Sequence, residues 1–222
     1  MDADHLLTWL ASLPPESRDA ELERHLGIVT PPDSSSPGEN LAGYIPSGVA
    51  PILRMLMEVP VVAEDVFIDI GAGLGKAVLL ARLLVGATAR GVELQPKLVE
   101  RAREAAEAAG VDVSFRCSDA REAALDDGTV FYFWAPFRGP VLVAVLDRLR
   151  AVAARRPIVV CSLKKDFERE APWLEARSVD TGLLTIYDSA EPGVPRRRAT
   201  GARLAGPAAE DVAFGRPSRC TS

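Results

Sequence analysis

A glycine-rich turn behind a short apolar run constrains the fold of this chain more than any other stretch. Val66–Ile70, V-F-I-D-I, predicts a buried β-strand, and Gly71–Gly75 follows with glycine at every second position. The apolar run Ala77–Val85 then predicts a helix that packs back on the strand. Glycines let a ligand lie against bare main chain, and the free N–H groups of a first helical turn carry partial positive charge. The stretch predicts a nucleotide-sized binding turn, the alternative being a tight turn without a ligand.

Asp69, two residues before the first glycine, separates the two cofactor classes that use such a turn. Dinucleotide-binding domains have G-x-G-x-x-G and place a pyrophosphate on the helix N-terminus, where a carboxylate would repel it. A carboxylate can instead accept hydrogen bonds from an ammonium group. The order D-x-G-x-G-x-G resembles the first motif of the class I S-adenosylmethionine (SAM)-dependent methyltransferases. The resemblance implies that this loop holds the amino-acid end of SAM.

Two more acids follow predicted strands, at the sheet edge where ligands of open α/β folds bind. Glu93 follows the strand Thr88–Val92 and can accept both ribose hydroxyls of an adenosine, a feature that methyltransferases share with NAD enzymes. Asp119 follows the strand Val111–Cys117, and the resemblance implies that it accepts a hydrogen bond from the adenine amino group, with a neighbouring N–H serving a ring nitrogen. The SAM-binding residues expected in this way are Tyr44, Asp69, Gly71, Ala72, Gly73, Gly75, Glu93, Leu94, Asp119, Ala120 and Trp134.

The segment Gly43–Ser47, G-Y-I-P-S, precedes a predicted helix over Val49–Met57. One interpretation is a capped turn with Ser47 as the N-cap. The other rests on a resemblance, because a tyrosine and a helix upstream of the glycine loop are similar to the catalytic domain of the non-SET histone-lysine methyltransferases and their bacterial relatives. In those enzymes a tyrosine-containing loop closes over SAM, which implies the same role for Tyr44.

The strand Thr129–Trp134 leads into Ala135-Pro136-Phe137, which the resemblance places opposite the transferred methyl group. Many amine-methylating members have Asn or Asp before the proline, and the histone-methylating enzymes have a pair of Asn residues nearby. This chain has neither. Trp134 and Phe137 form either an aromatic wall beside the sulfonium, in a cation–π contact, or ordinary core. No catalytic residue is identified, and the candidates are Tyr44, Trp134 and Phe137.

Strands and helices alternate along the chain, which predicts an α/β fold with a doubly wound, mostly parallel, seven-stranded Rossmann-like sheet. Residues 1–40 are expected to form a helical addition and a loop, residues 41–190 the SAM-binding domain, and residues 191–222 a basic, mobile tail. The addition contains predicted helices at Asp4–Leu13, with Asp4 as N-cap, and at Glu16–Leu26. It either caps the sheet edge or covers the active site.

The last part of the domain has the pattern of ordinary scaffold. The strand Pro157–Leu163 is followed by Lys164–Asp166, which either line the acceptor pocket or lie in a solvated loop. A short helix is predicted over Phe167–Trp173, and a hairpin joins Ala176–Val179 to Leu183–Tyr187.

Charge and cysteine content exclude several classes of protein. The net charge of −5 argues against nucleic acid as a general partner, although residues 193–222 carry six Arg against two acids. Three separated cysteines indicate neither a disulfide framework nor a zinc site, so no metal is expected. An acidic N-terminus and the lack of a membrane-length apolar run predict a cytoplasmic protein without a membrane partner. The oligomeric state is left open.

The motifs together predict a class I methyltransferase that converts SAM to S-adenosyl-L-homocysteine. Both histidines, His5 and His25, precede the core domain, so a hydroxyl acceptor would need another base, whereas an amine need only arrive unprotonated. A nitrogen acceptor on a small molecule or peptide is therefore favoured over oxygen, with protein lysine as an alternative. An NAD-dependent oxidoreductase and a non-catalytic SAM-binding or interaction protein are the rival classes.

Overall fold

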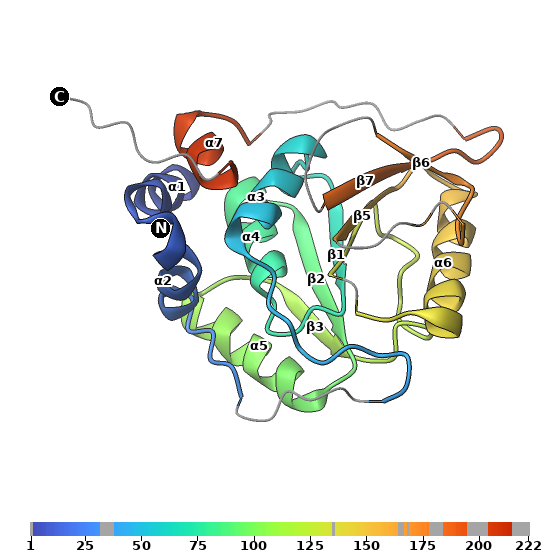
Figure 1. Cartoon of the computed structure of the whole chain (residues 1–222), viewed down its shortest axis with the longest axis horizontal. Coiled ribbons are helices and arrows are strands. Elements are labelled where there is room, and N and C mark those ends of the chain that lie inside the picture. Colours follow the sequence, from blue (N-terminus) through green and yellow to red (C-terminus); the bar gives the residue numbers. More distant parts are fainter. Residues whose placement is uncertain are drawn as a thin grey trace.

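The computed structural model describes residues 2–31, 38–134, 136–163, 167, 169–177, 184–194 and 204–214. Its centre is one seven-stranded sheet in the order β3-β2-β1-β4-β5-β7-β6 (Figure 1). The five strands from β3 to β5 pair in parallel, whereas β7 pairs antiparallel with both β5 and β6. The strands are β1 Val66–Ile70, β2 Thr88–Glu93, β3 Ser114–Cys117, β4 Val130–Phe133, β5 Val159–Leu163, β6 Leu174–Ala176 and β7 Leu184–Ser189. This order confirms the predicted Rossmann-like fold.

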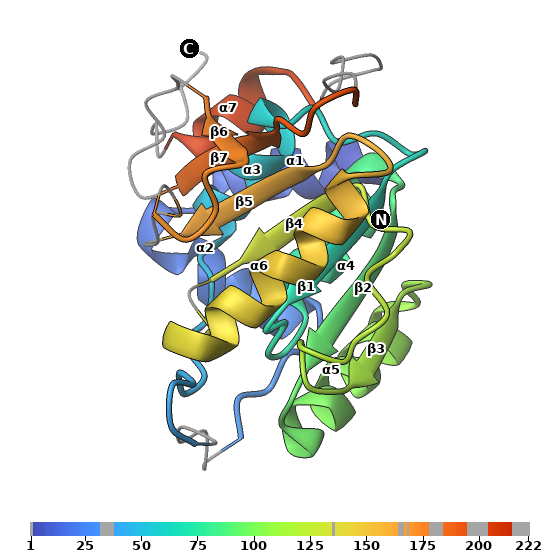
Figure 2. The ribbon, with the colours of Figure 1, turned by 90° about the vertical axis from the view of Figure 1, so that its right-hand side faces the viewer.

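Helices cover both faces of the sheet, and α6 lies alone in front of it in Figure 2. The helices are α1 Ala3–Ser12, α2 Arg18–His25, α3 Val49–Glu58, α4 Lys76–Val85, α5 Pro96–Ala109, α6 Gly139–Ala153 and α7 Pro207–Ala213, with a short 3-10 turn η1 at Pro15–Ser17. Because side chains alternate along a strand, Phe67 packs in the core under α3 and α4, and Ile68 packs in the core under α6.

The N-terminal helices pack on other helices. α1 lies against α4 and α7, and α2 lies against α3, so the addition forms an outer layer on that side of the molecule (Figure 1). Leu10 and Leu22 are fully buried in the same apolar core as α3 and α4. The expected position at the sheet edge is therefore wrong. The N-cap prediction was also wrong, since Asp2 caps α1 by accepting from the His5 N–H at 2.9 Å.

Part of the segment expected to be a mobile tail is a packed helix. α7 lies against α1 and α3, with Val212 fully buried. The buried guanidinium of Arg18 joins these helices by donating to the carbonyls of Leu10 at 3.0 Å, Leu13 at 3.2 Å and Asp211 at 3.0 Å. α7 therefore docks through buried apolar residues together with the hydrogen bond from Arg18.

Several expected elements differ in length or type. β3 begins at Ser114 because the Val111 N–H still bonds to the Ala106 carbonyl as the chain leaves α5. The described part of 167–173 contains turns instead of the predicted helix. The expected antiparallel pair is present as β6 and β7, but β6 covers Leu174–Ala176 and shares only Ala176 with the predicted strand Ala176–Val179. Several expectations concern residues outside the described ranges, namely Ala135, Lys164–Asp166, the predicted turn within 178–183, the predicted loop within 32–37 and the arginines at 196–198. No helix in the described ranges has the length and apolarity to cross a membrane.

Candidate active site

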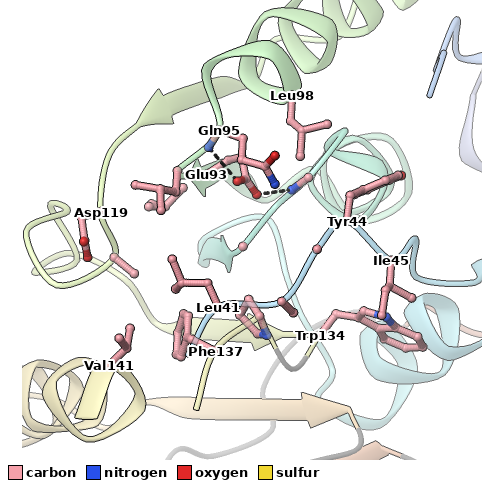
Figure 3. Close-up of a pocket in the computed structure, with 18 of the residues that line it drawn as sticks. Leu41, Tyr44, Ile45, Glu93, Gln95, Leu98, Asp119, Trp134, Phe137 and Val141 are labelled. Carbon is pink, nitrogen blue, oxygen red and sulfur yellow. Dashed lines mark hydrogen bonds between the residues drawn. The ribbon is translucent and has the colours of Figure 1, made fainter. Parts of the chain in front are cut away.

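A hollow lies at the carboxyl ends of the parallel strands, where the predicted binding residues converge (Figure 3). It encloses about 710 Å³ of empty space, counting the part open to solvent. Eight of the eleven predicted cofactor residues line it: Tyr44, Gly71, Gly73, Glu93, Leu94, Asp119, Ala120 and Trp134. Asp69 and Ala72 line a smaller hollow beside it, which also contacts Tyr44, Gly71 and Trp134.

The glycine loop is covered so closely that side chains would not fit. Gly71 and Gly73 both have positive φ, at 86° and 53°. A Cβ on Gly73 would lie 2.5 Å from Cε2 of Tyr44, and a Cβ on Gly71 would overlap Pro136. Gly75, the N-cap of α4, lines neither hollow, and a Cβ there would overlap the Phe115 ring. The role of Gly75 as a cofactor contact thus stays a prediction, while its role in packing is visible.

Asp69 is buried and incompletely bonded. It is the residue before the last one of β1, and its Oδ1 has no hydrogen-bond partner among the described residues. Burial, and next the neighbouring Glu93 carboxylate, raise the pKa of Asp69 well above its ordinary value. A buried acceptor of this kind has a high desolvation cost unless a donor reaches it. The ammonium group of a methionine tail supplies both donors and opposite charge, so the residue fits SAM.

Glu93 is held rigidly by main-chain donors. Its Oε2 accepts from the Gly73 N–H at 3.0 Å and its Oε1 from the Gln95 N–H at 2.9 Å (Figure 3). Each carboxylate oxygen can accept more than one hydrogen bond, so both remain able to accept from ribose hydroxyls. The residue therefore links the glycine loop to the end of β2 and presents a fixed acceptor pair to the hollow.

Asp119 lies across the hollow from Tyr44 (Figure 3) and is ion-paired. Its Oδ2 is 2.6 Å from Nη2 of Arg121, and this hydrogen bond lowers the pKa of Asp119. The carboxylate is ionised and keeps acceptor capacity for an adenine amino group. Leu94 and Ala120 line the same end of the hollow and provide apolar surface for a base.

Residues 40–48 form a strap that crosses the hollow. Its first part pairs with the loop after β4, because the Ala42 N–H donates to the Pro136 carbonyl at 2.8 Å and the Arg138 N–H donates to the Asn40 carbonyl at 3.0 Å. Its last part meets the sheet where Tyr132 Oη donates to Ser47 Oγ at 3.2 Å. The strap places Tyr44 over the glycine loop.

Ser47 is not the N-cap of α3. Gly48 occupies that position without a capping side chain of its own, and the Ser47 hydroxyl is bonded to Tyr132 instead. Ser47 and Lys76 both line the smaller hollow with Asp69. A hydroxyl group is a donor for a carboxylate, so Ser47 is placed to hold the other charge of the methionine tail, whereas Nζ of Lys76 contacts the carboxylates of Asp19 and Glu23. The proline and serine after Tyr44, and a lysine at the start of α4, were the available sequence signals for Ser47 and Lys76.

Trp134 and Phe137 both face the hollow, and Phe137 is also core. Phe137 is buried with its ring centroid 5.8 Å from that of Phe133, edge to face, while still lining the cavity. Trp134 is half-buried and lines both hollows. For Phe137 the two alternatives from the sequence are therefore both true, because the ring is part of the aromatic wall and also part of the core. Leu41 and Val141 extend this apolar wall and were missed because they lie outside the glycine-loop and strand-end motifs.

No obvious general base faces the hollow among the described residues. The His25 ring packs against Trp9 at a tilt of 46°, with ring centroids 5.2 Å apart, and neither histidine lines the two hollows. Burial, and then the charges of Glu23, Asp69 and Glu93, raise the pKa of Tyr44 well above its ordinary value of 10. Tyr44 therefore stays protonated. The described ranges also contain no cluster of His, Cys, Asp and Glu able to hold a metal ion.

Similarity to known proteins agrees with this geometry. Residues 67–156 match the family described as methyltransferase domain. An RNA methyltransferase from Salinibacter ruber, crystallised with S-adenosyl-L-homocysteine, is 31% identical, with 68% of this chain and 97% of that chain covered and a TM-score of 0.55. A search of curated proteins gave no match.

More distant structures share the fold alone. A putative RNA methyltransferase from Pyrococcus horikoshii is 18% identical over 78% of this chain and 97% of its own, with a TM-score of 0.53. A SAM-dependent methyltransferase from Aquifex aeolicus is 13% identical over 62% and 88%, with a TM-score of 0.50. The glycine loop, the buried Asp69 and the Salinibacter relative agree on one cofactor, SAM. The chain therefore belongs to the class I SAM-dependent methyltransferases.

Proposed function

We propose that this methyltransferase acts on a nitrogen nucleophile, in preference to oxygen, on a small-molecule or peptide acceptor. The observation that carries the proposal is the apolar acceptor wall of Trp134, Phe137 and Val141, together with a Tyr44 phenol that cannot act as a base at neutral pH. SAM supplies an electrophilic methyl group on a sulfonium whose leaving thioether is neutral. The protein then has to align the acceptor and exclude water, which can contribute about 7–11 kcal/mol.

An apolar hollow favours the nucleophilic form of an amine. Desolvation disfavours an ammonium group and lowers its pKa, so an amine that enters beside Trp134 and Phe137 is more readily neutral there. Desolvation does not activate a hydroxyl group with an ordinary high pKa, because this group must be deprotonated by a base to become a strong nucleophile. The carboxylates of Asp69, Glu93 and Asp119 are proposed to bind the cofactor, which leaves none of them for that task.

Protein lysine is the finer alternative suggested by the resemblance to non-SET histone-lysine methyltransferases. The desolvation argument applies to a lysine side chain as well as to a small amine. The paired Asn residues of those enzymes are missing here, however, and the described wall between Trp134 and Phe137 offers no side-chain amide or carboxylate. Lysine peptides are therefore one arm of the test.

A nucleobase in RNA is a second candidate, favoured by the 31% identity to the Salinibacter ruber RNA methyltransferase. A heterocyclic ring nitrogen has a lone pair at neutral pH and suits an aromatic wall by stacking. The net charge of −5 opposes general binding to nucleic acid. RNA is consequently the competing acceptor against which the first proposal is measured.

Transfer of a radiolabelled methyl group from SAM tests these acceptors side by side. The full chain is incubated with heterocyclic and primary amines, lysine peptides, phenols and total RNA, with Asp69→Asn protein as the control for background transfer. Label on amines or peptides, at a rate that rises with pH toward the pKa of the acceptor, is expected. Label on phenols alone or on RNA alone would contradict the proposal, and turnover in any arm would exclude a non-catalytic protein.

A further inference from the structure

Two acids on α2 bind one nearly buried lysine at the start of α4. Asp19 Oδ1 lies 2.8 Å and Glu23 Oε1 lies 2.5 Å from Nζ of Lys76. The Lys76 side chain is only 6% exposed, whereas Asp19 is 46% exposed. Lys76 directly follows the glycine loop, so this pair of contacts ties the N-terminal addition to the cofactor-binding turn.

Asp19 also caps a helix to which it does not belong. Its Oδ1 accepts from the Val49 N–H at 2.9 Å, at the first residue of α3, and a Cβ on Gly48 would lie 3.4 Å from its Oδ2. A carboxylate is stabilising at this end of a helix because the first N–H groups are unpaired and the dipole is positive there. The strap ends at this point, so one carboxylate fixes the end of the strap and the start of α4.

Tyr44 lies between these anchors and the cofactor loop. Its ring contacts the backbone at Gly73, three residues before Lys76. Glu23 is close enough to Tyr44 to act on its ionisation. No residue of α1 or α2 lines either hollow. The helical addition is thus next to the strap and the loop without contacting the space for SAM.

We propose that Asp19 and Lys76 are positioning residues that hold the Tyr44 strap against the glycine loop, so that the N-terminal addition controls SAM affinity through Tyr44. The addition then supports the cover of the site instead of forming it, which differs from both interpretations of the sequence. The inference rests on SAM binding and not on the identity of the acceptor. Its failure would leave the proposal of a nitrogen acceptor unchanged.

Calorimetric binding of SAM to the full-length protein tests this role. Asp19→Ala removes the cap of α3 and one partner of Lys76, and the Kd for SAM is expected to rise about tenfold, the factor that corresponds to the loss of a typical cap. Glu21→Gln is the matched control, since Glu21 lies on the same helix and pairs with Arg24 alone among the described residues. Its Kd should equal that of the unchanged protein. An Asp19→Ala protein that is folded and binds SAM within twofold of the control would overturn the proposal.

A double-mutant cycle with Tyr44→Ala separates positioning from general destabilisation. If Asp19 acts through Tyr44, Asp19→Ala should change the Kd for SAM by less than twofold when Tyr44 is already absent, because coupled residues are not additive. Additive losses in the double variant would contradict the mechanism, even if each single variant binds weakly.

Asp19→Asn keeps the test decisive if the alanine variant does not fold. The amide oxygen can still accept from the Val49 N–H, but the ion pair with Lys76 is lost. Weaker SAM binding by this variant would assign the effect to the contact with Lys76, provided that the same substitution has no effect on the Kd in the Tyr44→Ala background. If Asp19→Ala does not fold and Asp19→Asn binds SAM with the same Kd as the unchanged protein, Asp19 contributes only to stability, and the proposal is overturned.

Discussion

The buried carboxylates of Asp69 and Glu93 lie close enough to repel each other, yet Glu93 has a main-chain donor for each oxygen, whereas Asp69 Oδ1 has none within the described part of the chain. The two side chains come from the ends of the adjacent strands β1 and β2. The free protein therefore keeps one poorly solvated acid at the place where we propose that the ammonium group of SAM binds. This arrangement favours binding at some cost to folding stability.

Replacing Asp69 by Asn should stabilise the free protein while abolishing SAM binding. The pKa of Asp69 is raised in the folded state, so its contribution to stability is complete below the unfolded value of about 3.9 and is lost as pH rises through the folded pKa. Asn does not ionise and avoids that loss. We expect the Tm at pH 8 to rise by roughly 2–4 °C, the shift for each kcal/mol in a domain of this size, and the gain to shrink near pH 4. Thermal scans at both pH values check this, and a gain of the same size at each would contradict it.

SAM binding by the unchanged protein should weaken as pH falls. The ammonium group needs an ionised Asp69, so a proton must leave wherever the raised pKa keeps the carboxyl protonated. The affinity should fall by at most about tenfold per pH unit in that range, the limit for one linked proton. Calorimetry in two buffers with different ionisation enthalpies measures the proton release. Equal heats in both buffers across the range would mean that Asp69 is already ionised in the free protein.

Tyr44 should matter for its ring and not for its hydroxyl. The raised pKa keeps the phenol protonated, and the ring covers Gly73. Tyr44→Phe is expected to retain kcat within about threefold. Tyr44→Ala should raise the KM for SAM about tenfold, which corresponds to about 1.4 kcal/mol and is at the upper end of the range of about 0.5–1.5 kcal/mol for an aromatic contact. Steady-state kinetics with any acceptor found above separates the two. A Tyr44→Phe protein without activity would make the hydroxyl catalytic.

Gly73→Ala should weaken SAM binding without unfolding the domain. Its Cβ would lie 2.5 Å from the Tyr44 ring, and the positive φ of 53° costs a non-glycine residue about 1–2 kcal/mol. The strap must then move away from the loop, and Gly73→Val should abolish binding altogether. Calorimetry with circular dichroism as the control for folding measures this. Micromolar SAM binding by the valine variant would contradict the assigned site.

Arg18→Met should destabilise the protein by roughly 2–3 kcal/mol, because several carbonyls of α1 and α7 lose a charged donor. Arg24→Met is the matched control, since Arg24 lies on the same helix with a side chain 69% exposed. Urea unfolding of both variants gives the comparison. If the Arg18→Met and Arg24→Met proteins have the same free energy of unfolding, α7 docks through its apolar contacts alone.

The sequence by itself determined the alternation of strands and helices, the glycine turn and the acids at the strand ends. These features depend on local periodicity and on the rule that parallel strands place their carboxyl ends at one edge. Asp69, Glu93 and Asp119 could therefore be predicted to lie near one another, and they line two adjacent hollows at that edge, Glu93 and Asp119 the larger one and Asp69 the smaller one.

Only the tertiary structure decided what holds the cover of that edge in place. The capping of α3 by Asp19, the contact of Tyr44 with Gly73 and the docking of α7 through Arg18 join residues 29 to 193 positions apart. No local pattern encodes such pairs, because an exposed acid on one helix has the same sequence signature whether or not another helix begins beside it. The cofactor loop was predictable from spacing, and a family resemblance implied Tyr44 as its cover. The residues that hold this cover in place were not predictable, because they meet only through packing between distant segments.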